Sequence, residues 1–398
     1  MICTLVLPFV LTKSFSIEDY GKWSIFQSTV MWMFLMDFGV GNALQNKLSS
    51  TKKLNVRLEY MIITNIFNTI LALLGVIIFW GGVSPFFNFS LSLSISFSIV
   101  ILSIPFNLVG KYWISRGYSH KVEYYSFISN AMFVVVVVVS YCLGFISLAW
   151  CLIVYSLTLV APKVFYFMKS LIPRVALLMS FHREKVIELN VSRHSLISFL
   201  KTSVSFFIAQ VVFIFLLTSI RYSFAYYELY NYAAIFDIVF RPITIAIMVF
   251  ILLLRPIWSD ISMKFSSGNI DSCKKTIIRL FVLYILTLIF VCFLNHINVT
   301  NFLYEKWVPD VYIDDKAISA TLVFGMTVIL HNIVSYIMNG LSLIKEQVYY
   351  NFIGVLLCVG GFFLLSHNHQ YIDFVLIYSL AFSPLCILGC GKLYKVLR

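Results

Sequence analysis

The chain has 398 residues, of which 61% are hydrophobic, 17% aromatic and only 12% charged. An ordinary soluble domain carries about 25% charged residues and could not cover this much apolar surface. The same composition excludes an intrinsically disordered chain. The net charge of +12 indicates basic loops that face an anionic membrane surface, rather than a nucleic-acid partner.

Apolar runs long enough to cross a bilayer recur along the whole sequence. A spanning helix needs about 20 mostly apolar residues. Eleven segments meet this requirement: 20–43, 58–80, 90–112, 123–144, 146–168, 199–220, 230–254, 277–295, 317–340, 347–366 and 371–391. The apolar run 1–11 covers only about 16 Å as a helix, so we expect it to be the second half of a twelfth span. The sequence therefore predicts an all-α polytopic membrane protein with about twelve transmembrane helices.

The distribution of basic residues supports this number of spans. If the N-terminus is cytoplasmic, 23 Lys and Arg residues fall on the cytoplasmic side. Five fall on the opposite side, namely Lys13, Lys22, Arg221, Lys306 and Lys316. This asymmetry agrees with the positive-inside rule, and it predicts that both termini lie in the cytoplasm.

Two six-helix halves follow from the position of the longest basic connection. We expect an N-terminal lobe at 1–169, a cytoplasmic connection at 170–198 and a C-terminal lobe at 199–398. The pattern E-x-Y-x4-I-F begins at Glu18 and again at Glu228, which indicates an internal repeat. Six spans in each half leave the halves in the same orientation. That arrangement is typical of transporters with a central cavity between parallel repeats.

Three charged residues lie well inside predicted spans, where ionised side chains are costly and usually face a bundle interior or a water-filled cavity. They are Asp37, Asp237 and Arg241. Asp237 and Arg241 are four residues apart, so they share a helix face and can pair. Either this pair only locks two helices together, or Arg241 offers a cation to an anionic substrate near the bilayer centre. In the first case, removing Arg241 alone would leave a buried, uncompensated acid.

Asp37 stands near the predicted inner end of its span, before Gly39 and Gly41. Glycines at these positions permit close backbone approach or bending. Two interpretations remain open for Asp37. It pairs with a neighbouring lysine at the membrane interface, or it takes part in gating.

Polar side chains recur at helical spacing on several other spans. Such stripes are either helix-packing seams or the lining of a polar cavity, whose hydroxyls and amides would suit a sugar. The stripes and the intramembrane charges together give the candidate substrate-binding residues. These are Arg241, Asp237, Asp37, Asn42, Asn65, Asn68, Asn107, Arg116, Gln210, Asn332 and Asn339.

Motifs for enzymatic or metal chemistry are not found in the sequence. It has no G-x4-G-K-[ST] phosphate loop, no H-E-x-x-H zinc motif and no paired catalytic acids. His367 and His369 stand too isolated to indicate a metal site. We therefore expect a transporter rather than an enzyme, without a cofactor, and we leave coupling to an ion gradient open.

Several segments carry a family resemblance. They are Leu11–Gly21 with the aromatic residues after it, Asp37–Ala43, and Arg255–Asp260 after the eighth predicted span. They resemble the Wzx-type O-antigen flippases, polysaccharide transport proteins of the multidrug/oligosaccharidyl-lipid/polysaccharide exporter superfamily. The twelve-span, two-lobe layout agrees with that family, and the missing first half of the first helix departs from it.

The resemblance implies that the chain flips an undecaprenyl-pyrophosphate-linked O-antigen unit from the cytoplasmic to the periplasmic face of the bacterial inner membrane. The movement would proceed by alternating access and without ATP. The implied partners are the lipid-linked oligosaccharide, the lipid bilayer, and the O-antigen polymerase with its chain-length machinery. Related flippases receive the pyrophosphate in a cationic cavity, and Arg241 is the residue at the right depth for that role.

Three alternatives remain. A drug or cation antiporter of the same superfamily would be expected to carry unpaired intramembrane acids, whereas Asp237 lies beside Arg241. A polytopic membrane enzyme such as an O-antigen polymerase would be expected to show a large outward loop, and the longest predicted one is only about Asn295–Lys316. A structural membrane scaffold would leave an arginine at the bilayer centre unexplained.

Overall fold

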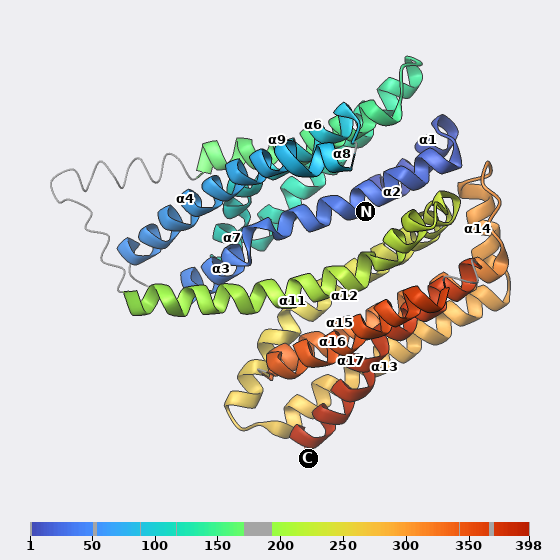
Figure 1. Cartoon of the computed structure of the whole chain (residues 1–398). Helices are drawn as coiled ribbons and strands as arrows, with labels where there is room; N and C mark the ends of the chain where they lie inside the picture. The colour runs from blue at the N-terminus through green and yellow to red at the C-terminus, as the bar shows by residue number, and fades with distance from the viewer. Residues whose placement is uncertain are drawn as a thin grey trace. The chain divides into compact units, whose positions relative to one another are not determined.

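The computed structural model describes residues 2–50, 54–87, 89–116, 118–170, 193–341, 343–365 and 370–397. All regular secondary structure within these ranges is helical (Figure 1), which confirms the predicted fold class. Most of the basic connection predicted at 170–198 lies outside the described residues, as do His367 and His369.

The chain folds into two compact units, and residues Phe26–Val211 form the second of them. This unit receives the second part of α2 (Ile17–Met33) and the first part of α11 (Arg193–Tyr226). Between them lie η1 (Phe34–Asp37), α3 (Val40–Ser50), α4 (Leu54–Ile78), η2 (Phe79–Val83), α5 (Ser84–Phe86), α6 (Leu91–Leu102), η3 (Ile104–Asn107), α7 (Leu108–Ser115), α8 (Ser119–Cys142) and α9 (Leu148–Ser170).

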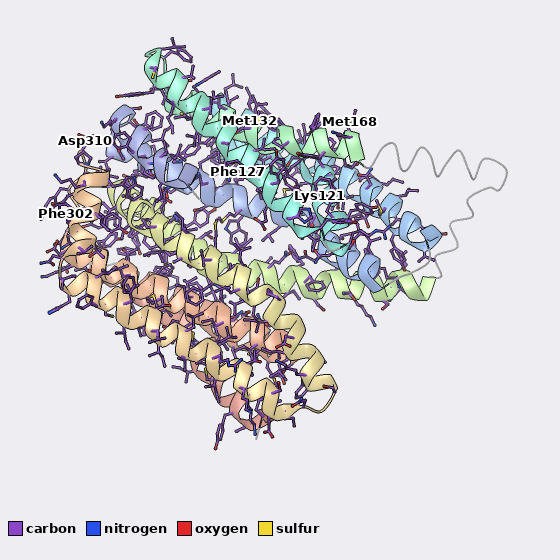
Figure 2. The ribbon with its side chains drawn as sticks, turned by 180° about the vertical axis from the view of Figure 1, so that it is seen from behind. Lys121, Phe127, Met132, Met168, Phe302 and Asp310 are labelled. Carbon is purple, nitrogen blue, oxygen red and sulfur yellow. The ribbon has the colours of Figure 1, made fainter. Side chains whose placement is uncertain are left out.

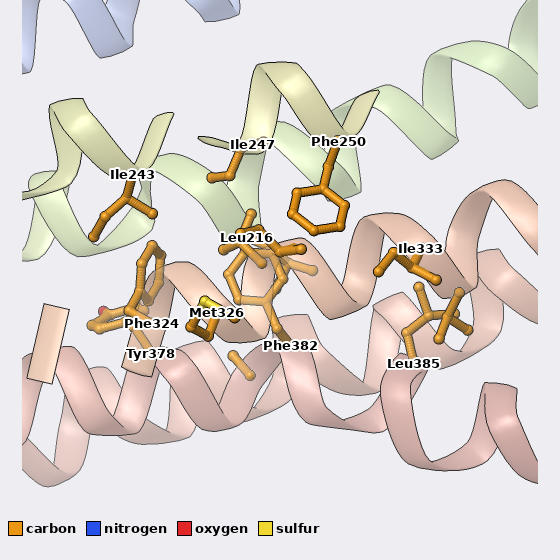
Figure 3. Close-up of a cluster of buried hydrophobic side chains, with 14 of the residues drawn as sticks. Leu216, Ile243, Ile247, Phe250, Phe324, Met326, Ile333, Tyr378, Phe382 and Leu385 are labelled. Carbon is orange, nitrogen blue, oxygen red and sulfur yellow. The ribbon is translucent and has the colours of Figure 1, made fainter. Parts of the chain in front are cut away.

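The first unit combines the chain start, Met1–Ile25, with residues Val212–Arg398. It contains α1 (Ile2–Ser14), α12 (Tyr230–Ser266), α13 (Ile270–His296), α14 (Val299–Trp307), α15 (Asp315–Gly340), α16 (Ile344–Leu364) and α17 (Tyr371–Leu397). Helix α15 packs against α12, α13, α16 and α17, and both α15 and α17 contribute many buried side chains to the core of this unit. Figure 3 shows Phe324 of α15 and Phe382 of α17, whose ring centroids lie 5.6 Å apart.

Nine helices among the described residues are long and apolar enough to cross a membrane. A tenth crossing is the pair Leu91–Leu102 and Ile104–Ser115, which is bent by 44° at Ser103. The short apolar helix α1 and the broken run α2–η1–α3 would be the two remaining spans, so the structure is consistent with twelve transmembrane spans. The predicted lobe boundaries remain a prediction.

One predicted span differs in detail from the structure. The segment 20–43 is not a continuous helix, because the chain turns at Phe38 (φ 50°) and Gly39 (φ 74°) before α3 begins. Such left-handed backbone angles end a helix, and glycine adopts them without strain.

Exposed apolar side chains cover the outer faces of both units. In the second unit, Phe127 and Met132 of α8 are 55% and 41% exposed, and both are marked in Figure 2. In the first unit, α13 exposes Ile289 and Phe290 among many others. A soluble monomer would rarely leave so much apolar surface uncovered, so these faces are suited to lipid.

Candidate functional site

The carboxylate of Asp237 lies at the centre of a buried cluster in the first unit. Arg241, one helical turn away on α12, reaches it with Nη2 and Nε, each 2.8 Å from Oδ2. Arg221 of α11 places Nη2 3.2 Å from Oδ1. Tyr20 of α2 donates its hydroxyl to Oδ2 at 2.9 Å. All four residues are at most 9% exposed.

The cluster ties three helices together. Arg221 also donates from Nε to Ser24 of α2 at 3.1 Å, and its guanidinium lies 5.0 Å from the ring centroid of Phe236. One carboxylate thus meets two guanidinium groups, and the cluster keeps a net positive charge away from water. Buried charges persist only when they are paired and hydrogen-bonded, and this network supplies both conditions.

The predicted pair of Asp237 and Arg241 is present, but the sequence missed its other partners. Arg221 was assigned to an outward loop because the apolar run stops at residue 220, whereas α11 continues to Tyr226. A fourth charged residue therefore lies at membrane depth. The sequence feature that could have placed Arg221 inside the helix is the mostly apolar stretch Tyr222–Tyr226, which follows it without a glycine or proline.

The two copies of the E-x-Y pattern meet in the first unit. A Cβ atom on Gly21 would lie only 2.0 Å from the carbonyl oxygen of Tyr230, so only glycine allows α2 to approach α12 this closely. Lys22 lies over the ring of Tyr230, 5.3 Å from its centroid. The starts of α2 and α12, which carry the two copies of the pattern, are thus in contact, and the internal repeat itself stays a prediction.

Asp37 in the second unit caps a helix. Its carboxylate accepts hydrogen bonds from the backbone N–H groups of Gly39 at 2.9 Å and Gly41 at 3.2 Å. These bonds fix the turn that breaks the predicted span and satisfy N–H groups at the start of α3, where an acidic side chain is favourable. The structure therefore gives Asp37 a structural task in addition to any role in gating.

Two lysines approach the η1 turn that carries Asp37. The ammonium group of Lys111 is hydrogen-bonded to the amide oxygen of Asn42 and lies near enough to Asp37 for electrostatic attraction. Lys163 of α9 lies over the ring of Phe34, with 4.2 Å between its Nζ and the ring centroid. Within the described residues Lys163 makes no ion pair. The sequence missed both lysines because they stand near the ends of apolar runs.

Unpaired polar atoms mark other candidates in the second unit. The side-chain oxygens of Asn65, Asn68 and Gln210 are buried and accept no hydrogen bond, as is also true of Thr64 Oγ1. A buried polar atom without a partner is costly, so these positions suit contacts with water or a ligand. Of the remaining candidates here, Asn107 ends η3 and Arg116 lies over the ring of Tyr112.

The candidates on α15 have a more structural character. Asn332 is 6% exposed and donates to the carbonyl oxygen of Val328, one turn earlier in its own helix. Asn339 lies two turns further on, half-buried. The sequence also missed His331, which is buried and bonded through Nε2 to Asn351 at 2.8 Å. Among the predicted site residues, Asp237 and Arg241 are therefore in direct contact, and Asp37 and Asn42 both lie near Lys111.

The sequence matches no family model, and no curated protein matches it either. Solved structures do match. A multidrug resistance MATE family transporter of the MOP superfamily, in an inward-facing conformation, superposes with a TM-score of 0.72 over 99% of this chain and 94% of that chain. The chain has the fold of a MATE transporter.

Two other similar structures extend this finding. An outward-facing MATE family transporter gives a TM-score of 0.62 over 100% of this chain and 94% of that chain. The MATE multidrug transporter DinF-BH, solved as a complex, gives 0.69, over 99% and 91%. The identities are only 11%, 12% and 13%, so the likeness concerns the fold. The superfamily suggested by the sequence and its flippase branch stay predictions.

Proposed function

We propose that the chain is a multi-pass membrane transporter that moves its substrate by alternating access. The observation that carries this proposal is the full-length match to both an inward-facing and an outward-facing transporter. A fold that is found in both states suits exposure of one site to each side in turn.

The first candidate substrate is a small organic molecule, exported as by a drug antiporter. It is supported by the similar structures, two of which are multidrug transporters by name. Such an antiporter would use the acids at membrane depth. Asp37 suits this role less well when it is held by two backbone N–H groups, and Asp237 less well when it is held by two arginines.

The second candidate substrate is a lipid-linked oligosaccharide with a pyrophosphate group, as the flippase resemblance implies. Its specific support is the set of buried cations, because Arg221 and Arg241 share the single carboxylate of Asp237 and Lys111 lies near Asp37. A pyrophosphate cannot cross about 30 Å of hydrocarbon without such help. The polymerase and chain-length proteins are proposed partners only if this second candidate is correct.

Purified protein in phospholipid vesicles would decide between the two. One arm measures efflux of a fluorescent organic cation, and the other measures movement of a pyrophosphate-linked oligosaccharide to the opposite leaflet. Movement in only one arm selects that substrate class. No movement in either arm, with protein correctly inserted, would contradict the transport proposal itself.

The variant Arg241→Gln tests the substrate-binding role of Arg241. The sequence alone suggested that this change would leave Asp237 uncompensated. The structure changes that expectation, because Asp237 keeps Arg221 as its partner at 3.2 Å. We therefore expect normal insertion, and a loss of oligosaccharide movement only if Arg241 receives the pyrophosphate. Arg241→Lys should restore part of it, since a lysine offers a single charge without the guanidinium fork.

The proposed location is the bacterial inner membrane with both termini in the cytoplasm. Reporter fusions can test the topology without any transport assay. A fusion after Lys275, between α12 and most of α13, should report cytoplasm, and one after Lys306 in α14 should report periplasm. Reversed signals would overturn the topology.

A further inference from the structure

A cavity of about 410 Å³ opens beside α14 in the first unit. Its walls come from α1, α12, α13, α14 and α15, and they include Pro242, Ala246, Val291 and Leu303. Two further lining residues, Ile243 of α12 and Met326 of α15, are shown in Figure 3. The volume lies in the range of about 300–1,000 Å³ that is usual for ligand pockets.

The polar groups around this cavity are already bonded within the protein. Tyr304 donates its hydroxyl to the carbonyl oxygen of Val239 at 2.8 Å, and Trp307 donates its indole N–H to that of Leu5 at 2.8 Å. The hydroxyls of the two lining threonines are bonded as well, to Leu283 and Asn295. These four side chains therefore offer a ligand no free hydrogen-bond donor, and a hydrocarbon fits the mostly apolar lining best.

The cavity continues the lipid-facing surface of α13. Thr287, Val291 and Leu294 line it, while Ile289 and Phe290 of the same helix are each 59% exposed. An apolar cavity of this kind does not hold water stably. In a membrane, the hydrocarbon within reach is the lipid that covers α13.

We propose that this cavity holds an acyl chain of a bilayer phospholipid. The chain would enter past α13 and lie under α14, against Pro242 and Ala246 of α12. Pro242 is the residue next to Arg241, and it leaves one carbonyl of α12 without its helical N–H donor. The lipid chain would thus pack against the weakened segment of the helix that carries the charged cluster.

Photo-crosslinking in phospholipid vesicles tests this proposal. The probe is a phosphatidylethanolamine with a diazirine in the middle of one acyl chain, mixed into phosphatidylethanolamine and phosphatidylglycerol vesicles that hold the whole protein. Peptide mapping should find label on Met326, which lines the cavity and is only 6% exposed, as well as on the exposed Ile289. Label on Ile289 alone would overturn the proposal, and this measurement needs no variant.

A cavity-filling variant sharpens the test. Ala246→Phe should lower the label on Met326 by about tenfold or more, because the added ring occupies the space of the chain. The matched control Ile289→Phe adds bulk on the open face of α13 and should leave label on Met326 unchanged. Equal labelling of Met326 in wild type and Ala246→Phe would overturn the proposal.

Two other occupants would appear as distinct results. If excess tetraphenylphosphonium removes the label from Met326 but not from Ile289, the cavity binds an organic cation and the lipid proposal is wrong. If a photoreactive amino acid in place of the exposed lining residue Leu303 crosslinks to a second copy of the chain and Met326 carries no lipid label, the cavity is an interface between copies and the proposal is equally wrong. Label on Met326 that persists with tetraphenylphosphonium present supports the acyl chain.

Discussion

The two compact units each place one aspartate and two cations at membrane depth, but they hold them differently. In the first unit, Asp237 contacts Arg221 and Arg241 directly, and Tyr20 completes the network. In the second unit, Asp37 takes its hydrogen bonds from backbone N–H groups. Its two lysines bind a neutral amide and an aromatic ring.

This difference bears on which cluster can serve a substrate. To offer a guanidinium group, the first unit must break an ion pair in a low-dielectric environment, where such pairs are strong. In the second unit, Lys111 gives up its hydrogen bond to Asn42 and its attraction to Asp37, whereas Lys163 gives up a cation–π contact worth about 0.5–2 kcal/mol. The first cluster is therefore suited to joining helices, and Lys163 is the cation in this comparison that an anion would displace most easily from its contact. The sequence favoured Arg241 for binding an anion, which stays a prediction.

Among the variants considered, removal of the Asp237 carboxylate should lower the stability of the protein most. Asp237→Asn leaves two buried arginines without a counter-charge, and we expect a loss of about 3–5 kcal/mol of stability. The measurement is thermal unfolding of the purified protein in detergent, together with its level in the membrane. Combining Asp237→Asn with Arg221→Gln and Arg241→Gln should recover much of the loss. An unchanged unfolding temperature in Asp237→Asn would show that the cluster does not stabilise this unit.

The next largest loss of stability is expected where α2 packs closely against α12. Gly21→Ala places a Cβ 2.0 Å from the Tyr230 carbonyl oxygen, and backbone must move to relieve the clash. We expect about 1–3 kcal/mol of destabilisation, because Tyr20 would also leave Asp237. The matched control is Gly360→Ala in α16 of the same unit, whose Cβ position has nothing within 4 Å. That control should be neutral or slightly stabilising, since alanine favours a helix.

Much of the fold follows from the sequence because spans depend on length and apolar composition, which are local properties. The pair Asp237–Arg241 could be predicted because four-residue spacing fixes a helix face. Tyr20 as its partner could not, since that contact joins residues 217 positions apart. The break at Phe38 was missed because a glycine pair inside an apolar run also suits an unbroken, closely packed helix. Lys163 was missed because a lysine near the end of a span usually reaches the membrane surface.

Lys163 of the second unit allows a test of function in a variant whose stability should stay close to that of wild type. Lys163 makes no ion pair within the described residues, so Lys163→Met should leave the unfolding temperature close to that of wild type. If this lysine contacts a pyrophosphate, oligosaccharide movement should fall about ten- to a hundredfold, the range expected for one charged hydrogen bond. Efflux of an organic cation should not fall. A parallel loss in both assays would instead indicate a general defect in the transport cycle.

The smallest effect on stability is expected at the other aspartate. Asp37→Asn keeps a side-chain oxygen that can still accept from Gly39 or Gly41, and asparagine is as good a helix cap as aspartate. The cost should therefore be at most about 1 kcal/mol, well below that of Asp237→Asn in the same unfolding measurement. Lys111 would lose a nearby negative charge but keep Asn42. If the unfolding temperature is preserved while transport stops, Asp37 has a role in gating or coupling beyond its cap. If transport also persists, Asp37 serves only to fix the turn. A loss as large as that of Asp237→Asn would contradict the difference between the two clusters, because it would mean that Asp37 also neutralises buried cations.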